Sequence, residues 1–182
     1  MAQLKNLPES ATLRDVMRTY PRLARVALPL AQEVLRGPGE LTPAQRELLF
    51  AYGSGLNACH FCHGTHTAVA ERLGVDRAAI LGALDDIETA PVEARIKPLL
   101  RYVKKLTLTP SRMSPADADA VRAAGWNDDA LHEAIAVCAL HNFFNRWVEG
   151  TGVDANEEFF PVNAERLVTE GYRFSPPNAT AG

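Results

Sequence analysis

The central motif of this chain is Asn57-Ala58-Cys59-His60-Phe61-Cys62-His63-Gly64-Thr65-His66, and an acidic residue, Glu47, precedes it at the spacing E-x11-C-x2-C-x3-H. The segment 59–73 predicts a helix, because a glycine follows it in the position where helices commonly end. Successive helical residues turn by about 100°, so both cysteines and His66 should project along one face. We expect the thiols near the start of this helix, with the imidazole one turn beyond Cys62.

A second helix is predicted immediately before the motif, over residues 42–55. A threonine at its start suits the N-cap, and Pro43 suits the first helical position. If the two helices form an antiparallel hairpin around the turn at 56–57, residues equidistant from the turn lie level with each other. Glu47 should then face His66 across the pair, in a partly buried seam that also holds the thiols.

This arrangement favours thiol chemistry. The thiolate is the nucleophilic form of cysteine, and a neighbouring base raises its fraction at neutral pH. We expect His66 to take the proton of Cys62, and Glu47 to orient and charge-balance His66. Cys59 could then convert a sulfenic acid on Cys62 into a disulfide before oxidation becomes irreversible. The sequence therefore predicts thiol-dependent reduction of hydrogen peroxide or an organic hydroperoxide, without metal, haem or flavin.

These residues resemble the peroxidase-like branch of the alkylhydroperoxidase D (AhpD) and carboxymuconolactone decarboxylase superfamily. The superfamily's glutamate, CxxC pair and downstream histidine match Glu47, Cys59, Cys62 and His66. The resemblance implies that Cys62 is the peroxidatic cysteine and Cys59 the resolving one. One difference is Phe61, which stands where AhpD proper is expected to carry a second histidine. The specific match covers residues 40–75, and a looser likeness covers 140–152.

The resemblance also implies partners. The electron donor would be a dihydrolipoyl protein or a thioredoxin-like protein, and the assembly a homotrimer or a trimer-based hexamer. The residues themselves suggest a homo-oligomer, because the predicted helix at 130–148 has more apolar surface than one neighbour would cover.

Other interpretations of the motif stay open. Cys59 and Cys62 with His63 or His66 are acceptable zinc ligands, so a redox-sensing or zinc-binding helical module without turnover is the alternative function. No second ligand pair accompanies them, since Cys138 stands alone in an apolar segment and is expected to be a small buried hydrophobe. The partial charge of a helix N-terminus favours Cys59 as the more acidic thiol, whereas the histidine contact favours Cys62. A lyase or isomerase activity would leave both thiols dispensable.

The remaining pattern predicts an all-α fold, because no segment alternates at period two. We expect an AhpD-like helical bundle built around the antiparallel hairpin that carries the CxxC motif. Further helices are predicted at 21–35 with a kink at Pro29, 76–87, 91–106, 115–124, 127–147 and 164–170. Residues 1–174 should form a single domain and 175–182 a flexible tail.

Composition narrows the class of protein. A chain of 182 residues with 47% hydrophobic content fits one domain with an ample core. A net charge of −3 gives no reason to expect nucleic acid or an anionic membrane as a partner. The chain has no apolar segment long enough to span a bilayer and no apolar leader, and three cysteines with one close pair suit a reducing compartment. We expect a cytoplasmic protein.

The other histidines and the aromatic residues give weaker expectations. His60 and His63 are expected at the surface or beside the site, His132 at the surface, and His141 in the core. An apolar access channel could be built from Phe50, Tyr52, Phe61, Phe143, Phe144 and Trp147.

Overall fold

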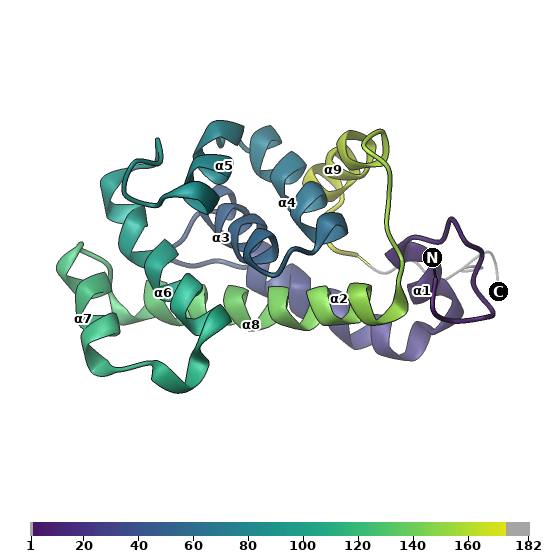
Figure 1. Ribbon diagram of the computed structural model, residues 1–182, viewed down its shortest axis with the longest axis horizontal. Coiled ribbons are helices and arrows are strands. Elements are labelled where there is room, and N and C mark those ends of the chain that lie inside the picture. Colours follow the sequence, from purple (N-terminus) through teal and green to yellow (C-terminus); the bar gives the residue numbers. More distant parts are fainter. Residues whose placement is uncertain (1, 174–182) are drawn as a thin grey trace.

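The computed structural model describes residues 2–173, and every regular element in that range is helical (Figure 1). The predicted all-α class is confirmed. The elements are α1 (Leu13–Thr19), α2 (Pro21–Arg36), α3 (Pro43–Leu56), α4 (His60–Arg72), α5 (Arg77–Asp85), η1 (Ala94–Ile96), α6 (Lys97–Leu108), η2 (Pro110–Arg112), α7 (Pro115–Ala123), α8 (Asp128–Thr151) and α9 (Phe159–Thr169).

The hairpin of α3 and α4 is confirmed as the centre of the fold. Thr42 caps α3 by accepting a hydrogen bond of 3.2 Å from the Gln45 amide, and Pro43 is the first helical residue. Ala58 turns the chain with a left-handed φ of 53°, and the Cys59 amide then donates to the Ser54 carbonyl at 3.1 Å. Backbone bonding across the turn thus fixes the register of the two helices.

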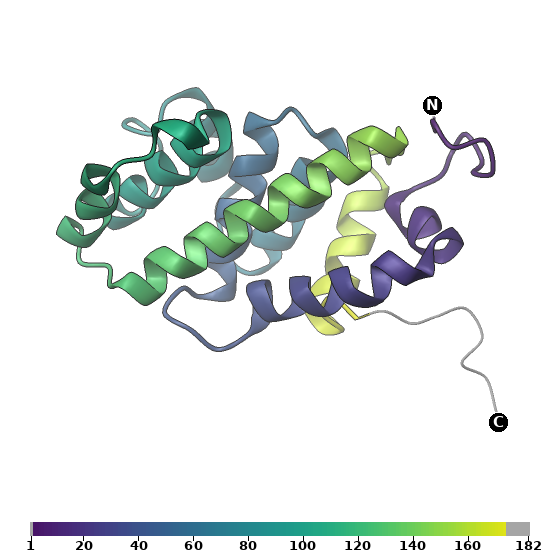
Figure 2. The ribbon, with the colours of Figure 1, turned by 90° about the horizontal axis from the view of Figure 1, so that it is seen from below.

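Helix α3 lies inside the molecule, and its residues from Arg46 to Ser54 are all buried. It packs against α4, α5, α6 and α8. Helix α8 passes beneath the hairpin with α2 alongside it, and α9 covers the outer side of α4 (Figures 1 and 2). The hairpin is therefore enclosed by helices that come from both ends of the chain.

Several predicted boundaries differ from the structure. The helix predicted from residue 91 begins only at Lys97, after the turn η1. A helix starting at 91 would place Pro98 in its interior, where proline lacks the required N–H, whereas in α6 Pro98 lies in the first turn. The helix predicted at 164–170 starts earlier, at Phe159, and the helix predicted to end near residue 147 continues to Thr151.

Helix α1 was not predicted, although Thr12 and Asp15 form a capping box at its start. The tail predicted at 175–182 lies outside the described residues. Within residues 2–173, no helix is both long and apolar enough to cross a membrane.

Candidate functional site

A buried hydrogen bond joins the two helices of the hairpin. Oε2 of Glu47 lies 2.6 Å from Nδ1 of His66. Glu47 has no exposed surface and His66 is 7% exposed. The predicted contact between these residues is confirmed, because the register set at the turn brings them level across the pair.

Glu47 has two further partners that the sequence did not predict. Nη1 of Arg36, the last residue of α2, lies 2.7 Å from Oε1 of the carboxylate. The hydroxyl of Tyr172, which follows α9, donates to the same oxygen at 2.7 Å. The ring of Tyr172 also lies 5.1 Å from the guanidinium carbon of Arg36. Glu47 therefore links four separate segments of the chain.

These contacts set the protonation of the acid and the phenol. Burial alone would raise the pKa of Glu47, but the charge and hydrogen bond of His66, the charge of Arg36 and the bond from Tyr172 together lower it. Burial and the neighbouring Glu47 carboxylate raise the pKa of Tyr172 well above its ordinary value. Glu47 is thus an anion surrounded by donors, and Tyr172 stays a neutral phenol.

The imidazole is held by stacking as well as by the carboxylate. Phe50 stacks on His66 with ring centroids 3.5 Å apart and planes 20° apart. Tyr172 lies nearly parallel to His66, with a centroid distance of 6.0 Å. Because Glu47 is ionised, Nδ1–H of His66 donates the hydrogen bond to it, and Nε2 is the nitrogen of this ring that can accept a proton from a neighbouring group.

The two cysteines occupy different positions. Cys59 is the N-cap of α4 and Cys62 lies in its first turn, and both are buried free thiols. Cys62 lines a cavity together with His66, whereas Cys59 does not line it. Hydrogen bonding to Cys62, with burial, raises the pKa of the Cys59 thiol. Cys59 therefore holds its proton more strongly than an ordinary cysteine does.

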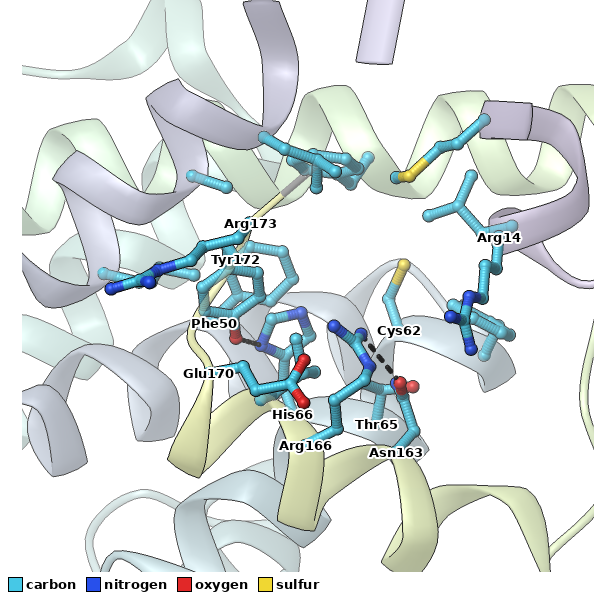
Figure 3. Close-up of a pocket in the computed structure, with 18 of the residues that line it drawn as sticks. Arg14, Phe50, Cys62, Thr65, His66, Asn163, Arg166, Glu170, Tyr172 and Arg173 are labelled. Atoms are coloured by element: carbon cyan, nitrogen blue, oxygen red, sulfur yellow. Dashed lines mark hydrogen bonds between the residues drawn. The ribbon is translucent and has the colours of Figure 1, made fainter. Parts of the chain in front are cut away.

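The cavity has a volume of about 150 Å³. An engineered protein cavity of about this volume can bind one benzene molecule. Figure 3 shows Cys62, Thr65 and His66 from α4 beside Phe50. Of the predicted aromatic channel, Phe50, Phe61 and Phe144 line the cavity, while Tyr52, Phe143 and Trp147 do not. Phe159 lines it as well and was not predicted.

Another part of the cavity wall is polar. It is formed by residues of α1, α9 and the segment after α9, namely Arg14, Arg18, Asn163, Arg166, Glu170 and Arg173. Figure 3 shows Cys62 between Arg14 and Arg166 in this view. None of these residues is predicted from the sequence, because they lie far from the motif along the chain.

The remaining histidines lie where the sequence predicts, outside the cavity. His60 is exposed, and its Nδ1 forms a hydrogen bond of 2.8 Å with Oδ1 of Asp154. Nδ1 of His63 forms a hydrogen bond of 3.0 Å with the Ala51 carbonyl oxygen. His132 is exposed. His141 is fully buried, and burial lowers its pKa to about 4, so it is a neutral core residue.

The zinc alternative gains no support from the geometry. In the part of the chain that the structure describes, no three His, Cys, Asp or Glu side chains lie together as metal ligands would. Cys138 is buried near Thr107, whose Oγ1 lies 3.4 Å from the sulfur, as expected for a small core residue.

Comparison with known proteins gives a consistent result. Residues 21–104 match the carboxymuconolactone decarboxylase family, and the search of curated proteins gave no match. The fold is similar to the alkylhydroperoxidase AhpD core of an uncharacterized peroxidase-related protein from Ralstonia eutropha JMP134. The TM-score is 0.76 and the identity 21%, over 84% of this chain and 80% of that chain.

Two further solved structures share this fold. A peroxidase-related protein from Silicibacter sp. TM1040 has a TM-score of 0.72 and 21% identity, over 88% of this chain and 94% of that chain. The debrominase Bmp8 has a TM-score of 0.67 and 17% identity, over 81% of this chain and 80% of that chain. These neighbours confirm the predicted fold.

Proposed function

Because the chain belongs to the AhpD-like superfamily, we propose that it is a thiol-dependent peroxidase that reduces hydrogen peroxide or an organic hydroperoxide. One observation carries the proposal. Cys62 and His66 line the same cavity, and His66 is held there by the buried carboxylate of Glu47. A nucleophile, a base and an orienting acid thus meet where a small substrate can enter.

The first step is reduction of the peroxide. Nε2 of His66 takes the proton of Cys62, and the thiolate attacks one peroxide oxygen. The O–O bond breaks, Cys62 becomes a sulfenic acid, and the proton on His66 passes to the leaving alkoxide to give an alcohol. Glu47 stabilises the imidazolium that exists between these proton transfers.

The second step uses the other thiol. The sulfur of Cys59 attacks the sulfenic sulfur of Cys62, which forms a disulfide and releases water. The raised pKa of Cys59 supports this order, because Cys59 stays protonated while Cys62 reacts with the peroxide. A dithiol donor then reduces the disulfide and returns both cysteines to thiols.

The donor must reach a buried pair. Cys59 has no exposed surface and Cys62 is 2% exposed. A slender dithiol can approach through the cavity, so a dihydrolipoyl arm suits the site better than the broad surface of a thioredoxin-like protein. Such a cycle requires a reducing compartment, so we place the protein in the cytoplasm.

We also propose that the protein is a homotrimer or a hexamer. Helix α2 exposes large apolar side chains at helical spacing, with Leu23 42%, Val26 64% and Leu30 55% exposed. A second copy of the chain could cover this apolar face. Light scattering of the purified protein tests this, and a monomeric mass would contradict it.

The catalytic proposal is tested by turnover. The native protein should consume cumene hydroperoxide with dihydrolipoamide as reductant, and oxidation should remove two free thiols per chain. Cys62→Ser should abolish consumption, while the control Cys138→Ala should retain it. Formation of the disulfide without turnover would indicate a redox-sensing module. Bound zinc would also contradict the proposal. So would release of bromide, without hydroperoxide consumption, from 2,3,4-tribromopyrrole, which is bound in a structure of a variant of the debrominase Bmp8.

A further inference from the structure

The polar wall of the cavity carries an excess of positive charge. Four arginines line it, two from α1 and two from α9 and the segment after it, and they are accompanied by one acid, Glu170. One of the four, Arg18, forms an ion pair, with its Nη1 3.7 Å from Oδ1 of Asp15. Among the described residues, no carboxylate forms an ion pair with Arg14, Arg166 or Arg173, although most ion pairs on this protein involve an arginine. Met1 and residues 174–182 contain no acidic side chain.

Arg166 is the arginine that α9 contributes to this wall. It is half-buried in the wall, and its guanidinium donates to the Asn163 side chain at 3.0 Å. Burial and the nearby charge of Arg14 lower the pKa of Arg166, against a smaller opposing effect of Glu170. Two cations thus line the same cavity, and an anion placed between them would relieve their repulsion.

Other residues that line the cavity suit an apolar group. Phe50, Phe61, Phe144 and Phe159 line it together with Leu13 and Leu35. A ligand that satisfies both sets of residues has an apolar body and one negatively charged end. Guanidinium groups bind carboxylates through paired, charge-assisted hydrogen bonds, and Glu170 on the same wall opposes a second negative charge.

We propose that the substrate is an organic hydroperoxide bearing a single carboxylate, whose apolar body lies among the phenylalanines and whose carboxylate pairs with Arg14 and Arg166. This inference rests on the proposed peroxidase function. Arg14 and Arg166 act here as specificity-determining residues, because they bind the carboxylate of the substrate and take no part in the proton transfers at Cys62 and His66.

The carboxylate site is tested by binding of ligands that cannot react. Octanoate and octanamide have the same apolar chain and differ in charge. Calorimetry on the reduced native protein should show octanoate binding about tenfold tighter than octanamide, the effect of one charge-assisted contact. Arg166→Gln and Arg14→Gln should each remove this preference, and Arg166→Lys should restore part of it. Equal affinity of the two ligands for the native protein would overturn the inference.

Matched controls separate binding from folding. Arg101 is exposed and pairs with Glu88 at 2.7 Å, and it does not line the cavity, so Arg101→Gln should keep the native preference for octanoate. Circular dichroism should show the same helix content in all variants. If Arg101→Gln lost the preference as well, the effect would reflect overall charge and the inference would fail.

Turnover then links the site to the reaction. Arg166→Gln should raise the KM for a hydroperoxide of octanoic acid about tenfold, and leave the KM for its methyl ester and for cumene hydroperoxide unchanged. An equal loss with all three substrates would mean that the arginine acts on the Cys62 thiolate instead, and would overturn the inference. If no hydroperoxide is consumed, the peroxidase function fails, while the preference for octanoate still decides whether the carboxylate site exists.

Discussion

The hydroxyl of Tyr172 donates a hydrogen bond to Glu47 from 125 residues away in the sequence. Nδ1 of His66 lies 3.4 Å from the same hydroxyl. The segment after α9 thus closes over the acid and the imidazole of the hairpin, and it supports the site although it carries no part of the CxxC motif.

Removal of this hydroxyl should weaken both the fold and the site. Tyr172→Phe keeps the ring and deletes one bond to a buried carboxylate, which should lower the free energy of unfolding by about 1.5–3 kcal/mol. Peroxide reduction should slow without being abolished, because Arg36 and His66 still hold Glu47. Urea unfolding and steady-state rates measure the two effects. An unchanged unfolding midpoint would show that the bond does not contribute to stability.

Acid should destabilise the protein through Glu47. The pKa of this carboxyl is lowered from its ordinary value of 4.5, so the stability gained from ionisation is complete above that pH and is lost as the pH falls through the lowered pKa. Glu47→Gln should remove this part of the pH dependence. It should also cost about 3–5 kcal/mol at neutral pH, because it breaks a buried ion pair. Urea unfolding of both proteins between pH 7 and pH 3 provides the comparison, and identical slopes would contradict the assignment.

The pKa values of His141 and His60 should be shifted in opposite directions from that of a free histidine. Burial lowers the pKa of His141 to about 4 from its ordinary value of 6.5, so the stability that it contributes is complete above pH 6.5 and falls as the pH drops towards 4. A hydrogen bond to Asp154 raises the pKa of the exposed His60. NMR signals of the rings should show His60 titrating above pH 6.5 and His141 unchanged down to pH 5. Titration of His141 near pH 6.5 would mean that its ring is reached by water.

Gly53 should be required for packing against His141. A Cβ added there would lie closer than 3.0 Å to the His141 ring, so Gly53→Ala should lower stability by about 1–3 kcal/mol through overpacking. Gly150 lies in α8 with open space around it, and Gly150→Ala should stabilise by about 0.5–1 kcal/mol through helix propensity. Thermal unfolding of both variants tests the contrast, and equal shifts would contradict it.

The sequence was most informative where one local pattern governs the geometry. The period of the helix and the turn at 56–57 predicted the contact of Glu47 with His66, because two adjacent helices with a short connection have one register. The apolar composition of the segment around them predicted the buried positions of Cys138 and His141. The predicted start of α6 at residue 91 was wrong, because Pro98 lacks the N–H that a helix interior requires and therefore lies in the first turn of α6.

The residues that complete the site were missed for a different reason. Arg36, Tyr172, Arg14 and Arg166 come from α1, α2, α9 and the chain after α9, and no spacing relates them to the motif. Their places depend on how distant helices pack around the hairpin, which is a property of the whole fold. An arginine at the end of a helix and a tyrosine after a glycine give no local signal of a shared carboxylate.

The central claim is that the sulfur of Cys62 attacks the peroxide. The most direct measurement uses Cys59→Ser and Cys62→Ser, each treated with one equivalent of cumene hydroperoxide in the presence of dimedone, which traps sulfenic acids. Peptide mass spectrometry should find the dimedone adduct on Cys62 of Cys59→Ser and none on Cys59 of Cys62→Ser. An adduct on Cys59, or no adduct in either variant, would contradict the account.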